Sequence, residues 1–152
     1  MIYKRTMAMK TMKDNNKGAV LVEFVIVLPL LLILLFASIE FGVLFYNQAM
    51  ITNASREGAR TGIVFRPDPR VDPAQIDQIV KNYCSDHVIT FGTPNDCEVE
   101  LPGTLPTASG ESLPVRVTYD YGFLLLPNLD FFGAMGIPTT IKLDAETVMR
   151  ME

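Results

Sequence analysis

The chain has 152 residues, enough for one modest domain plus a membrane anchor, and 49% of them are hydrophobic. Of its 13 basic and 17 acidic residues, five and one lie in residues 1–18, so this segment carries a net charge of +4 and the rest of the chain carries −8. An acidic main part argues against nucleic acid as a ligand, because phosphate binding requires a basic surface.

Residues 1–18 are predicted to be a polar cytoplasmic leader, and residues 19–46 a transmembrane helix. The only charges in 19–46 are Glu23 and Glu40, with sixteen uncharged residues between them, and about 20 apolar residues cross a bilayer. Because basic flanks stay in the cytoplasm, we expect a single-pass protein with its C-terminal part outside. A conventional secretory signal is disfavoured, since its apolar core has only about 7–15 residues.

Residues 47–65 are predicted to continue this helix outside the membrane. The stretch up to Gly62 contains no proline, and small or apolar residues recur on roughly one helical face. At 1.5 Å per residue, a helix over residues 19–62 would be about 65 Å long, so it would protrude from the bilayer. Pro29 removes one backbone hydrogen bond and can bend the helix, which membrane helices tolerate.

Residues 66–152 are predicted to form a small extracytoplasmic domain of the α+β class. A proline-rich linker opens it, and Asp72 and Pro73 are typical of the N-cap and first position of a short helix. This helix carries apolar residues on one face.

Strand signals follow the short helix. Alternating apolar and polar residues predict two longer strands over 115–121 and 141–149. Residues 88–91 and 98–101 are candidate short strands, and 102–114 are predicted to be a loop. We therefore expect an antiparallel sheet of about three or four strands with one wet face, the helices covering the other.

Cys84 and Cys97 are predicted to form a disulfide, because exported proteins with an even cysteine pair usually join it. A closed loop of this length contributes about 3 kcal/mol. Two separate thiols are the alternative. With a single histidine, His87, the cysteines make a poor zinc set, and we expect no metal.

Residues 123–132 are apolar, interrupted by Pro127, and too short to span a membrane. One interpretation is a loop folded over the sheet core. The other is an apolar tip that touches the membrane surface or a partner.

Glu23, five residues after Gly18, is the first residue that demands a functional explanation. A charged carboxylate within lipid costs about 2.5–3.5 kcal/mol, and pairing with an ammonium group would offset this cost and set the register between neighbouring helices. Ala19 would supply that ammonium if a peptidase cut after Gly18, where glycine leaves the backbone unhindered. The alternative is a later-starting span with Glu23 at the cytoplasmic interface.

Arg56 and Arg60 lie four residues apart and so share one helix face, where Glu57 compensates them only partly. They are placed to hold an acidic group of the domain or of a neighbouring subunit; a solvated helix face is the alternative. The sequence has no Ser/His/Asp arrangement, phosphate loop or metal cluster, so we expect no enzymatic activity and no cofactor.

Four motifs between residues 18 and 62 carry a resemblance to a known family. They run from Gly18 to Phe24, from Val27 to Leu32, from Ile39 to Gly42 and from Ala54 to Arg60. Together they resemble the TadE-like family, whose members include minor pilins (pseudopilins) of the bacterial Tad, or Flp, tight-adherence pilus. Residues 146–152 are similar to that family more loosely.

The resemblance implies a pilin-like minor subunit that helps to assemble a type IV-class pilus and acts in adhesion and surface attachment. It implies cleavage after Gly18 by a prepilin peptidase, with Ala19 as the new N-terminus and Glu23 as the fifth mature residue. The implied partners are the inner membrane, the peptidase, other pilins and minor pilins, and the assembly platform, and the mature chain would be located in the inner membrane or in an extracellular pilus. The alternative is an unprocessed single-span protein whose outer domain binds another component of the pilus or secretion machinery.

Overall fold

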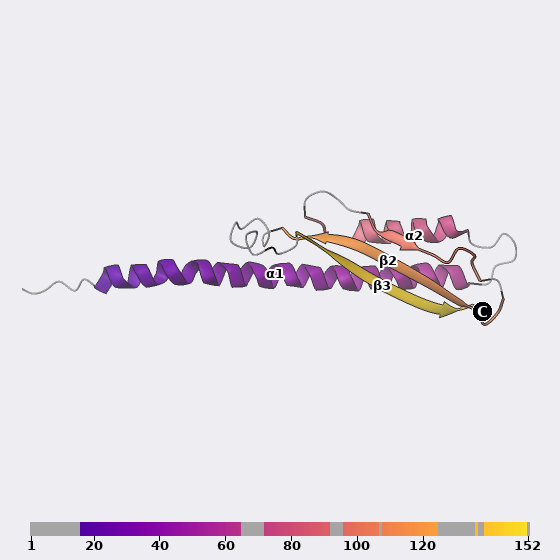
Figure 1. Cartoon of the computed structure of the whole chain (residues 1–152), viewed down its shortest axis with the longest axis horizontal. Coiled ribbons are helices and arrows are strands. Elements are labelled where there is room, and N and C mark those ends of the chain that lie inside the picture. Colours follow the sequence, from indigo (N-terminus) through magenta and orange to yellow (C-terminus); the bar gives the residue numbers. More distant parts are fainter. Residues whose placement is uncertain are drawn as a thin grey trace, which may run out of the picture. The chain divides into compact units, whose positions relative to one another are not determined.

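The computed structural model describes residues 16–64, 72–91, 96–106, 108–124, 136 and 139–151. The elements in chain order are α1 (Asn16–Ile63), α2 (Pro73–His87), β1 (Glu98–Glu100), β2 (Ser112–Gly122) and β3 (Thr140–Arg150) (Figure 1). The predicted α+β class is confirmed: a long apolar N-terminal helix is followed by a short helix and a three-stranded antiparallel sheet.

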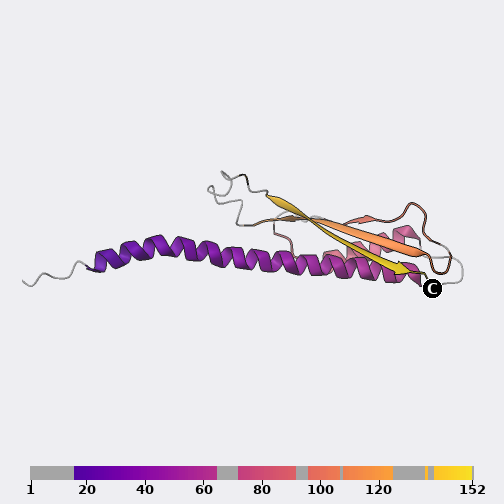
Figure 2. The same cartoon turned by 60° about the horizontal axis from the view of Figure 1, so that its bottom comes forward.

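The chain divides into two compact units, Met1–Leu35 and Phe36–Glu152. The ribbon of α1 is unbroken (Figure 2), and Pro29 lies inside the helix. Every side chain from Ala19 to Leu32 is exposed, although most of them are large and apolar. From Gly18 onward α1 is long and apolar enough to cross a membrane.

The second unit contains the sheet, in the order β1-β2-β3 with both pairs antiparallel. β2 and β3 pair along their full length, from Ser112 with Arg150 to Gly122 with Thr140. The alternation predicted for both long strands is observed, because the odd-numbered residues of β2 from Val115 to Tyr121 are buried and charged residues occupy the outer face.

Two details of the strand prediction were wrong. Residues 88–91 form no strand, because the backbone of Ile89 bonds to the side chain of Asn47 on α1 and not to a neighbouring strand. The predicted loop over 102–114 ends earlier, since Ser112 already pairs with β3.

α2 begins as predicted. Asp72 is the N-cap, its carboxylate accepts a hydrogen bond from the Ala74 backbone N–H at 3.3 Å, and Pro73 starts the helix. Its inner face buries Ile76 and Val80.

Both helices contribute to one core on the inner face of the sheet, and the C-terminal part of α1 lies close against α2 and β2. A Cβ atom at Gly58 would stand 2.6 Å from Val80 Cγ2, and one at Gly62 would come even closer to Leu113 Cδ2. Glycine at these positions therefore permits the close approach. The fully buried side chains include Ile51, Ile76, Val80, Leu113, Val115, Val117 and Tyr121.

Candidate functional site on helix α1

The predicted cleavage site lies at the beginning of α1. Gly18 is the third residue of the helix, and neither Gly18 nor Ala19 is covered by other parts of the chain. The first turn of a helix has backbone N–H groups without intrahelical partners, and glycine disfavours the helix by about 1 kcal/mol relative to alanine. The backbone at Gly18 is helical in the structure. A peptidase needs an extended backbone at the bond that it cuts, and this form arises when only the first turn of α1 opens.

Glu23 is exposed on α1, one turn beyond Gly18, among exposed apolar side chains such as Leu21 and Phe24. Within the part of the chain that the structure describes, it forms no hydrogen bond or ion pair. Its carboxylate is therefore available to a group outside this chain, while its pairing with an N-terminal ammonium stays a prediction.

Glu40 differs from Glu23 because it is buried, with 3% of its surface exposed. Its carboxylate accepts a hydrogen bond from the backbone N–H of Leu124, which follows the end of β2. Glu40 is one of the two charges in the predicted span, and the structure encloses it in protein. The sequence offered one signal of this contact, namely a carboxylate within the apolar run of α1. If such a charge is buried, it requires a hydrogen-bonding partner.

Tyr121, the penultimate residue of β2, lies in the same region. It is fully buried, and its hydroxyl has no hydrogen-bond partner among the described residues. Burial raises the pKa of Tyr121 to about 12, and the nearby charge of Glu40 contributes in the same direction. The phenol is thus kept neutral beside the carboxylate.

The cluster of Arg56, Glu57 and Arg60 lies on the outer side of α1. Both arginines are exposed and Glu57 is half-buried. No ion pair joins these three side chains to each other or to any residue in the described ranges. The acidic partner predicted for the arginines is therefore not supplied by the described part of the domain.

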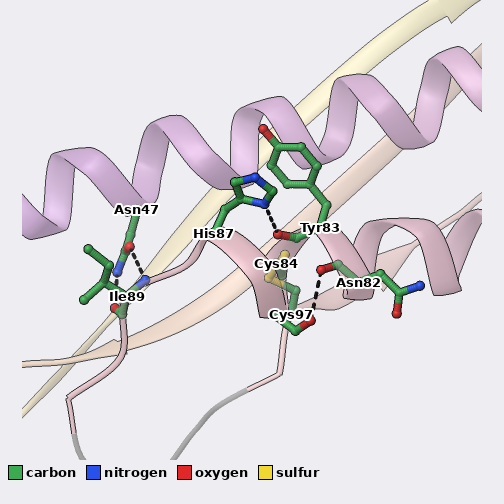
Figure 3. The surroundings of a disulfide bond; sticks show 8 residues. Asn47, Asn82, Tyr83, Cys84, His87, Ile89 and Cys97 are labelled. Carbon is green, nitrogen blue, oxygen red and sulfur yellow. Dashed lines mark hydrogen bonds between the residues drawn. A yellow bond between two sulfur atoms is a disulfide. The ribbon is translucent and has the colours of Figure 1, made fainter.

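Cys84 and Cys97 form a disulfide with an S–S distance of 2.11 Å (Figure 3). The bond ties the last turn of α2 to the segment that enters β1, so the predicted pair of cysteines is joined in the structure.

A second connection, which the sequence did not suggest, is made by Asn47. Its side chain is fully buried and bonds to both backbone groups of Ile89: Nδ2 donates to the carbonyl oxygen at 2.7 Å, and Oδ1 accepts from the N–H at 2.9 Å (Figure 3). The segment after α2 is thereby attached to α1. An amide in the middle of an apolar helix was the only local signal.

The outer face of the sheet carries charged side chains centred on Arg116. Its guanidinium lies 2.9 Å from Glu146 and 3.7 Å from Asp144. The bond to Glu146 and the neighbouring carboxylates raise the pKa of Arg116 above its usual value. Such exposed pairs contribute little stability. Within the described ranges, no group of three or more His, Cys, Asp or Glu is placed to hold a metal ion.

Several predictions fall partly outside the described residues: those for the leader over residues 1–15, for the linker over 65–71 and for the apolar segment over 125–132. Of that segment, only Phe123, half-buried, and Leu124, exposed, are described.

One comparison with known proteins gives a match. The family model for the TadE-like protein matches residues 18–60, which confirms the resemblance over this stretch. The matched residues contain the predicted cleavage site, both glutamates of the apolar run and the arginine pair. No curated protein and no solved structure matches the chain.

Proposed function

Because residues 18–60 match the TadE-like family, which connects the chain with the Tad pilus, we propose that it is a membrane-anchored minor pilin (pseudopilin) of a Tad/Flp type IV-class pilus. The observation that carries the proposal is the location of the match. It covers an apolar helix whose side chains are exposed from Ala19 to Leu32, with one exposed carboxylate, Glu23, among them.

The proposed mechanism is helix packing without chemistry of its own. An exposed apolar helix is stable in lipid or against other apolar helices, and in both settings an uncompensated carboxylate is costly. After cleavage following Gly18, the ammonium group of Ala19 on one subunit would meet Glu23 of the next. Such a pair offsets the cost of the buried carboxylate only when neighbouring helices are aligned at one axial register. The pair would therefore position the subunits in the filament.

The leader is proposed to remain in the cytoplasm and the second unit to lie outside the inner membrane. The disulfide between Cys84 and Cys97 supports this orientation, because disulfides persist in oxidising compartments and are rare in the cytosol. The role in adhesion and surface attachment follows from the proposed place in a pilus, as do the partners: the prepilin peptidase, other pilins and the assembly platform. We propose no enzymatic activity.

The second candidate is an unprocessed single-span protein whose outer domain binds another pilus or secretion component. The observation in its favour is the helical backbone at Gly18, which differs from the extended form that cleavage requires.

Mass spectrometry of the chain extracted from membranes of a strain with active prepilin peptidase separates the two candidates. The pilin proposal expects a mature chain that starts at Ala19, and an intact Met1 would refute processing. In the same strain, Glu23→Ala and the isosteric Glu23→Gln should abolish sheared pili while the protein stays in the membrane. Glu23→Asp, which keeps the charge, is the matched control and should retain part of the assembly. Normal pili with Glu23→Ala would favour the second candidate.

A further inference from the structure

Exposed apolar side chains gather at one end of the second unit. They come from four separate segments: α1, the residues after α2, the end of β2 and the start of β3. This set, here called the apolar rim, consists of Phe41 (48% exposed), Phe45 (68%), Ile89 (42%), Phe91 (37%), Leu124 (42%) and Ile141 (41%).

Contacts within the unit bring these segments to the same level of α1. The Leu124 N–H bonds to the Glu40 carboxylate, and the Ile89 backbone bonds to Asn47, about 10 Å further along the helix at 1.5 Å per residue. Ile141 pairs with Tyr121, three residues before Leu124. The rim therefore lies at the level of α1 between residues 40 and 47.

This level of α1 coincides with the end of the predicted membrane span, because the same helix continues from the span into the domain. Residues 18–39 form 22 helical residues, which are about 33 Å long, slightly more than the hydrocarbon thickness of about 30 Å. The span is thus complete before Glu40. The hydrogen bond and burial of Glu40 also fit this boundary, because they remove its carboxylate from lipid.

The two sides of α1 differ at this boundary. Glu40 is enclosed by the domain, whereas Phe41 and Phe45 are exposed. The amphipathic rings of Trp and Tyr accumulate at the level of the lipid headgroups, and Tyr46 (41% exposed) follows Phe45 in the chain. The helix thus presents aromatic side chains to the bilayer surface at the height where the domain is attached.

We propose that the apolar rim is a lipid-binding surface that rests in the interfacial region of the outer leaflet of the membrane that α1 spans. The proposal rests on the membrane anchoring in the proposed function. It accounts for six exposed apolar side chains from four segments at the one end of the unit that chain continuity holds beside the bilayer. Single exposed apolar residues are ordinary, but several of them at one end of a domain indicate an interaction site.

The sequence permits a direct test, because the chain contains no tryptophan. The full-length protein would be reconstituted into phosphatidylcholine–phosphatidylglycerol vesicles with a single tryptophan, introduced as Phe91→Trp or Ile141→Trp, and fluorescence compared with and without brominated acyl chains. Because both residues are exposed, either substitution leaves the core intact. Val148→Trp is the matched control: Val148 is 58% exposed on the same strand, about 23 Å from Ile141. Leu31→Trp reports on the span itself.

We expect Phe91→Trp and Ile141→Trp to emit at blue-shifted wavelengths and to lose most of their fluorescence in brominated lipid, as Leu31→Trp does. Val148→Trp should emit as in water and remain unquenched. If Leu31→Trp is quenched while both rim variants behave like Val148→Trp, the rim proposal is overturned and the anchor stands. If Leu31→Trp itself is not quenched, the anchoring fails and the rim proposal fails with it.

A second copy of the chain is the competing occupant. In that case the rim variants would show blue-shifted emission that brominated lipid does not quench, and the emission would return to longer wavelengths when the protein is diluted in lipid. This result would also overturn the proposal.

Discussion

Replacing Gly58 by alanine tests the packing that attaches α2 and the sheet to α1. The added Cβ atom would stand 2.6 Å from Val80 Cγ2, 3.4 Å from Val115 Cγ1 and 3.5 Å from Ile76 Cγ2. The preferred separation of two carbon atoms is about 3.5–4.0 Å, so the contact with Val80 is too short by about 1 Å. Val80 is fully buried and β-branched, so rotation about χ1 gives little relief.

The magnitude follows from two opposing effects. Overpacking a core costs about 1–3 kcal/mol, whereas alanine in place of glycine stabilises a helix interior by about 1 kcal/mol. The Gly58→Ala variant should therefore lose up to about 2 kcal/mol of unfolding free energy. Gly42→Ala in the same helix is the matched control, because its Cβ would meet nothing within 4 Å, and it should gain up to about 1 kcal/mol.

The assay is urea unfolding of the full chain in detergent micelles, with the disulfide kept oxidised and near-ultraviolet circular dichroism reporting on the buried Tyr119 and Tyr121. Free energies follow from linear extrapolation. The difference between the two variants should be about 1–3 kcal/mol, because the helix propensity cancels between them. Equal stability of Gly58→Ala and Gly42→Ala would refute the close packing of α1 against α2.

Three further outcomes are accessible to the same titration. Replacing both Cys84 and Cys97 by alanine should lower the unfolding free energy by about 3 kcal/mol, since their bond closes a loop between residues 13 apart in sequence; an unchanged midpoint would contradict this. Ionisation of Tyr121 should cost the wild type about 2 kcal/mol as the pH rises from 10 to 12, because the folded-state pKa of Tyr121, about 12, exceeds its unfolded value of about 10; this stability is present below pH 10. Tyr121→Phe should lack that part of the loss and be no less stable at pH 7, and an identical alkaline profile would count against it. Asn47→Ala should cost about 1–3 kcal/mol through its two lost backbone bonds, whereas Asn53→Ala, which loses no such bond among the described residues, should cost less.

Much of the secondary structure was predictable because it depends on local patterns. Hydrophobic periodicity located α1 and both long strands to within a few residues, and Asp72 with Pro73 marked the start of α2. The error at residues 88–91 has a physical cause. A short apolar run is consistent with a strand, but its backbone bonds can be satisfied by any partner, and here Asn47 supplies them for Ile89.

The residues of the candidate site also fall into two groups, those that the local sequence identified and those whose surroundings only the fold revealed. Gly18, Ala19 and Glu23 were singled out from sequence because a carboxylate in an apolar run is unusual wherever the chain folds, and their roles stay predictions. Glu40 has the same local signal, but its burial depends on Leu124, which is 84 residues away.

The sequence by itself determined an exposed apolar helix, an attached α+β domain and a cysteine pair, because length, periodicity and composition are properties of neighbouring residues. Only the tertiary structure decided that Glu40 is enclosed by the domain, that Asn47 holds the segment after α2, and that apolar side chains from four segments meet at one end of the domain. Those arrangements arise from contacts between residues 20 to 84 positions apart, which no local pattern encodes.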